Sequence, residues 1–265
     1  MSNETMTLLD GISWDKEELL SNMDLDSFYF GHLGKAALSS SACKELLKSS
    51  ITYYHSITKE KEPTDALIQG SIFHILVLEP DKLYDRYEFF DAQNKTVAFK
   101  KRVEESDKEV VLIKNLYFMR SLKKYLDRCE DASGLLQGGI EEVPAIGFIN
   151  GIPFRGKADY LKNNHIIDLK TTASLDNWNF TSRGKWDYDM QAYIYRELFN
   201  VDRFTFLVVE KITGRIGIYE ASEECFESGK EKIRICTDRY KEDFLEKSND
   251  EIESIIFNRC IHGTV

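Results

Sequence analysis

The chain is poor in several features that define whole classes of proteins. Its 265 residues include only 4 prolines and 5 cysteines, and no two cysteines form a C-x-x-C pair. Zinc ribbons and iron–sulfur clusters need closely spaced thiolates, so we expect reduced, partly buried cysteines instead. No run approaches the ~18 apolar residues that cross a bilayer, and the acidic N-terminus does not resemble a signal peptide. We therefore expect a cytoplasmic protein without membrane contact.

An excess of positive charge is also missing. Lys and Arg number 35 against 45 Asp and Glu, which gives a net charge of −10. Such a surface repels nucleic acid as a whole, so a polyanion must be bound locally and with the help of cations. Apolar area, by contrast, is plentiful: 42% of the residues are hydrophobic, including 16 Phe and 13 Tyr. This is enough for a substantial core in one or two domains.

Positive charge is concentrated in residues 95–128, which carry ten basic and five acidic residues. Within this segment, residues 110–128 have the apolar spacing of an amphipathic helix. Its polar side is either an ordinary solvated face or a surface that follows DNA phosphates. Considered by itself, this segment favours the solvated face. The basic residues that would contact DNA are Lys114, Arg120 and Lys124.

The remaining pattern predicts helices separated by a strand-rich centre. Ser39 and Thr64 are expected to cap two helices, the second ending before Pro80, and residues 81–109 have the composition of a connector. Helical spacing returns over 187–199 and 222–247, and residues 201–221 read as a hairpin around Thr213-Gly214. We find no linker or repeat, so one domain with helical N-terminal and C-terminal additions is expected.

Residues 141–171 are predicted to form strands joined by two tight turns. Asn150-Gly151 lies between apolar runs and is a strong hairpin signal, and Asn163-Asn164 also tolerates the positive φ of a type I′ turn. Two-residue turns at both places fix which residues face each other. Because alternate strand side chains point to one face, the same register fixes which side chains meet.

This register brings three carboxylates and a lysine to one face. Glu142 faces Asp159, Asp159 faces Asp168, and Lys170 lies two residues further on, whereas Glu141 points to the other face. Two carboxylates ~5 Å apart repel by roughly 3 kcal/mol at an effective dielectric near 20. Mg²⁺ or Mn²⁺ would offset this repulsion directly. The alternative, acids that simply face water, is disfavoured by the apolar run around Asp168.

Four ordered segments resemble the RecE-type exonuclease (exonuclease VIII) branch of the PD-(D/E)xK nuclease superfamily. They are GSIFHILVLEP, FRGKADYL, IIDLKTT and YDMQAYIY, and SSSACKELLKSS precedes them. The resemblance spans about residues 38–200. It implies an α/β (α+β) fold with a restriction-endonuclease-like core, in which helices flank a central mixed β-sheet. It also implies a single nuclease domain over 1–265, made of an acidic extension (1–37), the core (38–210), and a hairpin strand with a C-terminal helix (211–265).

The resemblance also implies roles for the acidic cluster. Lys170 would orient or help deprotonate the attacking water. His74, which alone reads as a core histidine, would ligate or position a second metal ion or touch the scissile phosphate. The ligands implied for Mg²⁺, with Mn²⁺ able to substitute, are Asp159, Asp168, Glu142 and the main-chain carbonyl of Leu169.

Two further groups of residues have an ordinary and a functional interpretation. Gln191 and Tyr195 share a helix face, where they either pack or, as the resemblance implies, act near the lysine and the substrate. Arg183, Lys185 and Trp186 form a basic-aromatic loop, which is either a surface loop or a site that holds a terminal phosphate or stacks a base.

The function that the resemblance implies is that of a Mg²⁺-dependent exodeoxyribonuclease. It would hydrolyse phosphodiester bonds at linear duplex ends, leave 5′-phosphates and serve a phage or prophage recombination system. Two alternatives stay open: an endonuclease of the same superfamily, and a non-catalytic module that binds DNA or a recombination partner. A homo-oligomer, ring-like in similar exonucleases, and a single-strand annealing partner are further implications that the sequence does not decide.

Overall fold

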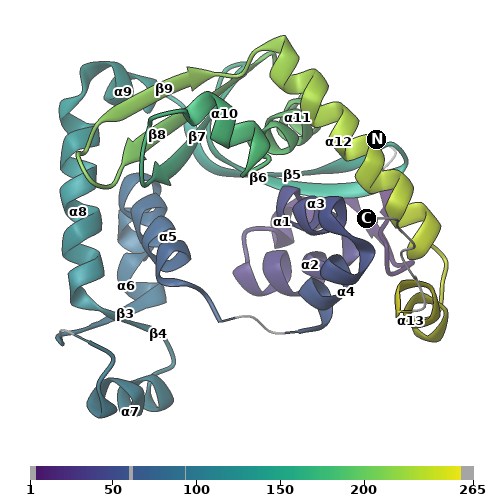
Figure 1. The fold of residues 1–265 in the computed structure, drawn as a ribbon, viewed down its shortest axis with the longest axis horizontal. Coiled ribbons are helices and arrows are strands. Elements are labelled where there is room, and N and C mark those ends of the chain that lie inside the picture. The colour runs from purple at the N-terminus through teal and green to yellow at the C-terminus, as the bar shows by residue number, and fades with distance from the viewer. Residues whose placement is uncertain (1–3, 60–61, 93, 258–265) are drawn as a thin grey trace, which may run out of the picture.

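The computed structural model describes residues 4–59, 62–92 and 94–257, and its centre is a five-stranded mixed sheet (Figure 1). Neighbouring strands are antiparallel except for β7 and β8, which are parallel and are connected through two helices. The expected fold class, a mixed sheet flanked by helices, is confirmed. In sheet order the strands are β5 (Ile140–Ile149), β6 (Ile152–Lys162), β7 (His165–Thr172), β8 (Arg203–Glu210) and β9 (Ile216–Glu220).

Both tight turns form with the predicted register. Ile149 pairs with Ile152 across the first turn, and Lys162 pairs with His165 across the second. Asn150 and Gly151 both have positive φ, as a type I′ turn requires. In the second turn only Asn163 has positive φ, so this turn differs from type I′ although it preserves the register.

Helices cover both faces of the sheet (Figure 1), and each face has its own hydrophobic cluster. On β7, Ile166 packs into one cluster, while Ile167 and Leu169 pack into the other. The helices around the first cluster are α3 (Ser40–Lys48), α4 (Ser50–Thr58), α10 (Trp178–Gly184), α11 (Tyr188–Phe199), α12 (Glu223–Asp243) and α13 (Asn249–Phe257). Those around the second are α5 (Asp65–Leu78), α8 (Ile113–Arg128) and α9 (Glu130–Leu135).

The N-terminal residues pack onto the edge of the sheet rather than standing apart from it. A third cluster joins them to Ile146 of β5, and Arg155 of β6 donates a hydrogen bond to the carbonyl of Leu33 at 3.0 Å. Their elements are β1 (Thr5–Thr7), β2 (Ser13–Asp15), α1 (Lys16–Asn22), a π-helix η1 (Ser27–His32) and α2 (Leu33–Ala36).

The expected connector at 81–109 is wrong, because this segment folds into short regular elements. Strands of four residues show too little periodicity to be recognised, and β3 finds its parallel partner β4 only about twenty residues later, starting with Tyr87 beside Glu109. The predicted helix over 110–128 also begins later, at Ile113. The elements are η2 (Pro80–Lys82), α6 (Leu83–Arg86), β3 (Tyr87–Phe90), α7 (Val97–Glu105) and β4 (Glu109–Leu112).

Two absences inferred from the sequence can be compared with the fold. None of the helices in the described ranges combines the length and the apolar composition that a bilayer crossing demands. The cysteines within these ranges are free thiols, in agreement with the expectation, and Cys260 lies outside the described residues.

Glu210, at the end of β8, ties the loop after β7 to the β8–β9 turn. Its side chain is buried, with 3% of the residue exposed. The carboxylate accepts hydrogen bonds from the guanidinium of Arg215 at 2.8 and 2.9 Å, from the hydroxyl of Thr213, and from the N–H of Leu175 at 2.9 Å. These donors, Arg215 first, lower the pKa of Glu210 to about 2.

We predict that Glu210→Gln destabilises the protein at neutral pH. A carboxylate whose pKa is depressed stabilises the fold above its ordinary pKa of 4.5 and loses this contribution as the pH falls toward about 2. The melting temperature of the variant should therefore lie several degrees below that of the wild type at pH 7, and the gap should narrow in acid. Glu220→Gln, which removes a half-exposed ion pair with Arg203, is the control and should change little. If the difference in melting temperature between the wild type and Glu210→Gln did not change with pH, the charged Glu210 would not be the stabilising group.

Candidate active site

The predicted carboxylates meet where β6 and β7 separate. Strand pairing ends at Tyr160 and Ile167, so the next position, Asp159 opposite Asp168, lies outside the ladder. Here the Asp159 carboxylate accepts the N–H of Leu169 at 2.7 Å, and a side chain takes the place of a strand partner. Asp159 therefore lines an opening between the strands, and Asp168 lies buried next to it.

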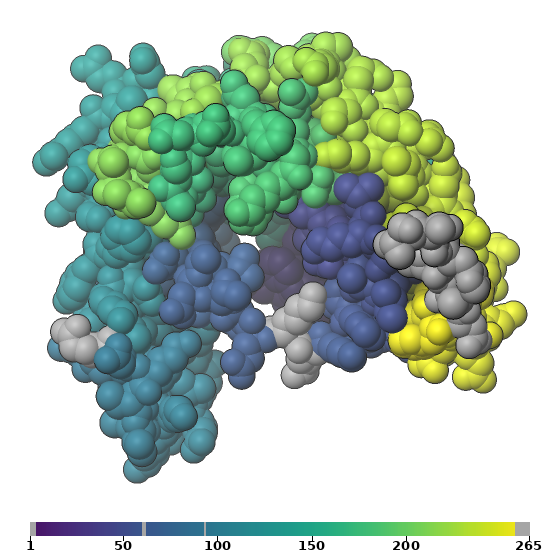
Figure 2. Space-filling model, in the orientation of Figure 1, coloured from purple at the N-terminus to yellow at the C-terminus, as the bar shows by residue number. Residues whose placement is uncertain are grey.

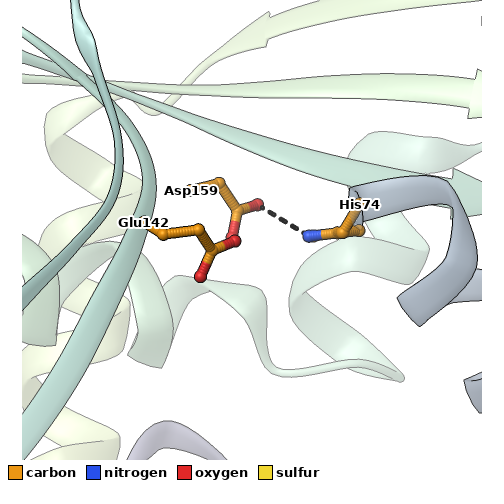
Figure 3. Close-up of side chains that lie close together, drawn as sticks. All are labelled: His74, Glu142 and Asp159. Atoms are coloured by element: carbon orange, nitrogen blue, oxygen red, sulfur yellow. Dashed lines mark ion pairs between the residues drawn. The ribbon is translucent and has the colours of Figure 1, made fainter. Parts of the chain in front are cut away.

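Glu142 is turned toward Asp159 by an unusual backbone conformation. Its neighbours Glu141 and Val143 pair with β6 in the predicted register, but Glu142 itself has a φ of 51°. A left-handed conformation at a residue other than glycine costs roughly 1–2 kcal/mol, and such strain is retained where surrounding structure imposes it. Figure 3 shows the result: the Glu142 carboxylate lies beside that of Asp159.

His74 reaches the same place from the other side of the groove. Thr64 caps α5 by accepting the N–H of Leu67, as the sequence predicted, and the apolar residues Ile72 and Phe73 bury the helix in the second cluster. His74 remains partly exposed and points its Nδ1 at Asp159, 3.5 Å from Oδ2 (Figure 3). The structure thus places it at the acids and outside the core.

Asp168 is fully buried, with 0% of its surface exposed, and it is fixed by two neighbours. Its Oδ1 accepts a hydrogen bond from Gln191 Nε2 at 2.6 Å. Its Oδ2 lies 2.5 Å from Lys170 Nζ, but it takes part in no hydrogen bond of good geometry. Gln191 and Lys170 therefore hold the carboxylate in place while one of its oxygens keeps free lone pairs.

The acids outnumber the positive charges beside them, and their pKa values reflect this. Burial and the neighbouring Asp159 raise the pKa of Glu142 to about 7. Burial, opposed by Lys170, raises the pKa of Asp168 to about 6. Burial would also raise the pKa of Asp159, but His74 and Lys170 outweigh it and lower that pKa. Burial is thus the main cause of the raised pKa values, and repulsion from Asp159 adds to it.

The donor set fits a hard divalent cation. Ligand atoms of His74, Glu142 and Asp159 all lie within 4.8 Å of one another, and the buried Asp168 oxygen without a hydrogen bond is a further donor. Leu169 buries its side chain in the second cluster, yet it also lines the groove, as expected of a residue that offers its main chain there. Carboxylate and carbonyl oxygens are the ligands that Mg²⁺ and Mn²⁺ prefer.

All of these residues except the buried Asp168 line a groove of about 920 Å³. Figure 2 shows a hollow between α5, in blue, and α3 and α4, in indigo. The groove lining carries six acidic side chains and five from Lys and Arg, so its charge is nearly balanced. The charged residues are Asp24, Asp26, Glu79, Asp85, Glu142, Asp159, Lys44, Lys82, Arg86, Lys157 and Lys170.

Sequence reasoning missed three residues of the groove. The ring of Tyr188 lies beneath two ammonium groups, with Lys44 Nζ 4.6 Å and Lys170 Nζ 5.0 Å from its centroid. Burial, and next the charge of Lys170, lower the pKa of Lys44 to about 8. The three missed residues are Lys44, Tyr188 and Lys157. Sequence spacing could have identified Tyr188, which is three residues before Gln191 on one helix, and Lys157, which is two residues before Asp159 on one strand.

Tyr195 lies away from the groove. Its hydroxyl donates to the carbonyl of Lys157 at 2.9 Å, and its ring packs against Phe204. It therefore supports strand β6 and is not among the residues that line the groove.

The basic residues expected to contact DNA also lie outside the groove lining. Arg183 pairs with Glu224 at 3.2 Å, and Lys185 Nζ lies 4.8 Å from the ring of Trp186, just before α11. Lys114, Arg120 and Lys124 lie on α8, where Arg120 lines a second cavity.

Comparisons with known proteins identify the fold independently of this geometry. The family model described as "PDDEXK-like domain of unknown function (DUF3799)" matches residues 39–251. A search among curated proteins gave no significant match. A crystal structure named "Putative exonuclease" from Eubacterium rectale has a TM-score of 0.61 and 18% identity, over 91% of this chain and 94% of that chain. A phage related exonuclease from Haemophilus somnus 129PT has a TM-score of 0.37 and 14% identity, over 82% and 88%.

At 18% identity the Eubacterium rectale structure is evidence for a shared fold alone, and the lower TM-score of the second carries no further weight. The family model, however, covers most of the chain and includes every residue of the acidic cluster. The chain therefore belongs to the PDDEXK-like family, and the expected membership of the PD-(D/E)xK nuclease superfamily is confirmed.

Proposed function

We propose that the protein is a metal-dependent deoxyribonuclease that hydrolyses phosphodiester bonds and leaves 5′-phosphates. The observation that carries the proposal is the convergence of His74, Glu142 and Asp159 on one groove. Lys170 lines the same groove and is paired there with the buried carboxylate of Asp168. Such a cluster is costly for the fold, since its charges repel and are partly buried. A structural ion pair matches one acid with one base, whereas a site for a divalent cation needs several acids together. The three acids beside Lys170 fit the second case.

The chain's own residues would share the work as follows. Glu142, Asp159, Asp168, His74 and the Leu169 carbonyl would hold Mg²⁺ or Mn²⁺. When bound, the cation supplies Lewis-acid stabilisation to a phosphate that gains negative charge. Lys170 has three donors and no acceptor, so we assign it to orienting the attacking water and to stabilising the phosphate. Gln191 keeps the Asp168 carboxylate in one orientation.

We further propose that the enzyme acts on the ends of linear duplex DNA. The resemblance to RecE-type exonucleases supports this, and so does the name of the Eubacterium rectale protein that shares the fold. The same resemblance supports Mg²⁺ as the resident ion, a phage or prophage recombination system and a single-strand annealing partner. Arg183, Lys185 and Trp186, just ahead of the helix that carries Gln191, and the basic face of α8 are the proposed DNA contacts.

Lys170→Ala and Asp168→Asn should each lower the rate of DNA hydrolysis by at least about 100-fold. Lys170→Ala removes the group assigned to the attacking water and the phosphate, and Asp168→Asn removes the charge of a proposed cation ligand. Timed digestion of a labelled duplex in Mg²⁺ measures the effect. Lys162→Ala, at the far tip of the same hairpin, is the matched control and should cleave at the wild-type rate. Unchanged hydrolysis by the Lys170 variant would refute its assigned role.

Linear and closed circular DNA of the same sequence should behave differently. An enzyme that starts at ends degrades the linear form and leaves the circle intact, because the circle offers no end. The experiment compares both substrates in Mg²⁺ and follows linear duplexes labelled at the 5′ or the 3′ end to obtain polarity. Opening of the circle at a similar rate would identify an endonuclease, and the absence of cleavage on any DNA with Mg²⁺ or Mn²⁺ would favour a binding module.

Divalent cations should stabilise the protein against heat without any DNA. A ligand at 100 times its Kd adds about 2.7 kcal/mol to the unfolding free energy, so Mg²⁺ or Mn²⁺ should raise the melting temperature measured in EDTA. Glu142→Gln should abolish most of this rise. In EDTA the same variant should melt no lower than the wild type, because one repelling carboxylate is gone. Glu141→Gln, its exposed neighbour, should keep the full rise. An equal rise in both variants would exclude Glu142 from the cation site.

A further inference from the structure

A second cavity, of about 630 Å³, lies on the other side of α6 from the groove. The segment from α6 into β3 forms the wall between the two: Asp85 and Arg86 line the groove, while Tyr84, Tyr87 and Phe89 line the cavity. Figure 1 shows α6, α7 and α8 together in one lobe. A chain that leaves the groove over this one-turn helix therefore arrives directly in the cavity.

Two exposed tyrosines face this cavity. Tyr84 is 55% exposed and Tyr117 is 60% exposed, so the rings of both are accessible to a ligand. Tyr84 is nevertheless held in place: its hydroxyl accepts a hydrogen bond from Arg120 at 2.9 Å, and Phe89 meets its ring edge to face at 5.9 Å. An aromatic ring fixed before a ligand arrives loses little conformational entropy on binding.

The charge of the cavity favours an anion. Glu88 is already neutralised by Arg102, which donates two hydrogen bonds to it, one of them at 2.7 Å. The remaining charged residues of the cavity lining are two bases, Arg120 and Lys108, and one acid, Asp107. Each of the two uses one donor on Tyr84, Lys108 binding its carbonyl at 2.7 Å, and so has further donors available for phosphate oxygens. Seven of the eleven residues that line the cavity belong to residues 95–128, the segment with excess positive charge.

We propose that this cavity binds a segment of single-stranded DNA, with bases stacked on Tyr84 and Tyr117 and phosphates facing Arg120 and Lys108. The inference rests on the proposed function in taking DNA as the ligand. Aromatic faces lined with cations are the usual means of binding single strands, and the bases must be unpaired to meet rings inside a cavity of this size. The segment would be a strand that has separated from the duplex at the groove and passed over α6.

The test is the binding of a fluorescein-labelled thymidine oligonucleotide of about 12 residues, followed by anisotropy in EDTA, where no hydrolysis occurs. Tyr117→Ala should weaken binding about ten-fold, the loss expected for one stacked base. Phe118→Ala is the matched control, since it removes a neighbouring exposed aromatic of α8 that does not line the cavity. Tyr84→Phe should bind nearly as the wild type does, because the stacking ring is kept.

Salt dependence separates a phosphate contact from a structural role. Arg120→Gln should lower the slope of log K against log salt by about 0.7, the value for one phosphate contact on a single strand. Lys123→Gln, on the same helix but paired with Asp127 at 2.7 Å, should leave the slope unchanged. Binding by Tyr117→Ala and Arg120→Gln at wild-type affinity and slope would overturn the inference. If the wild-type protein cleaved no DNA but Tyr117→Ala still weakened binding and Arg120→Gln still lowered the salt slope, only the proposed nuclease function would be overturned.

Discussion

Glu142 and Asp159 lie side by side in the groove, with the buried Asp168 close to them, and the fold holds these acids together although their charges repel. The arrangement depends on the point where β6 and β7 stop pairing, because the Asp159 carboxylate takes the N–H of Leu169 in place of a strand partner. Continued pairing would close this opening. The two hydrophobic clusters on either side of the sheet supply the burial that tolerates the local cost.

The centre of the site could be predicted because its geometry is local. Two turn signals fix the register of three consecutive strands, and strand alternation then decides which acids meet. The same alternation distinguishes Glu142 from Glu141, although it does not predict that Glu142 adopts a positive φ to reach Asp159. Helix starts at Ser39 and Thr64 were also predictable, since a capping hydroxyl needs only the next turn of the chain.

What could not be predicted depends on contacts between distant segments. His74 looks like a core residue in its own helix, and its place at the acids was implied only by the family resemblance; the packing of α5 beside β6 brings it to Asp159. Lys44 approaches Lys170 because α3 and α11 pack on the same face of the sheet, with Tyr188 between the two ammonium groups. The parallel pair β3–β4 has strands too short for a sequence period and joins residues far apart along the chain.

The proposed action on DNA sets a problem of charge for an acidic protein. Its net charge of −10 and the near balance of charge in the groove provide no general attraction for a polyanion. Contact must then come from a cation among the carboxylates and from a separate basic surface. The fold keeps these apart by a single turn of helix, with the acids on one side of α6 and Arg120 and Lys108 on the other. Acidic side chains therefore still outnumber lysine and arginine in the groove lining, which suits a divalent ion, while under the proposal the phosphates of a bound strand would meet positive charge on the other side of α6.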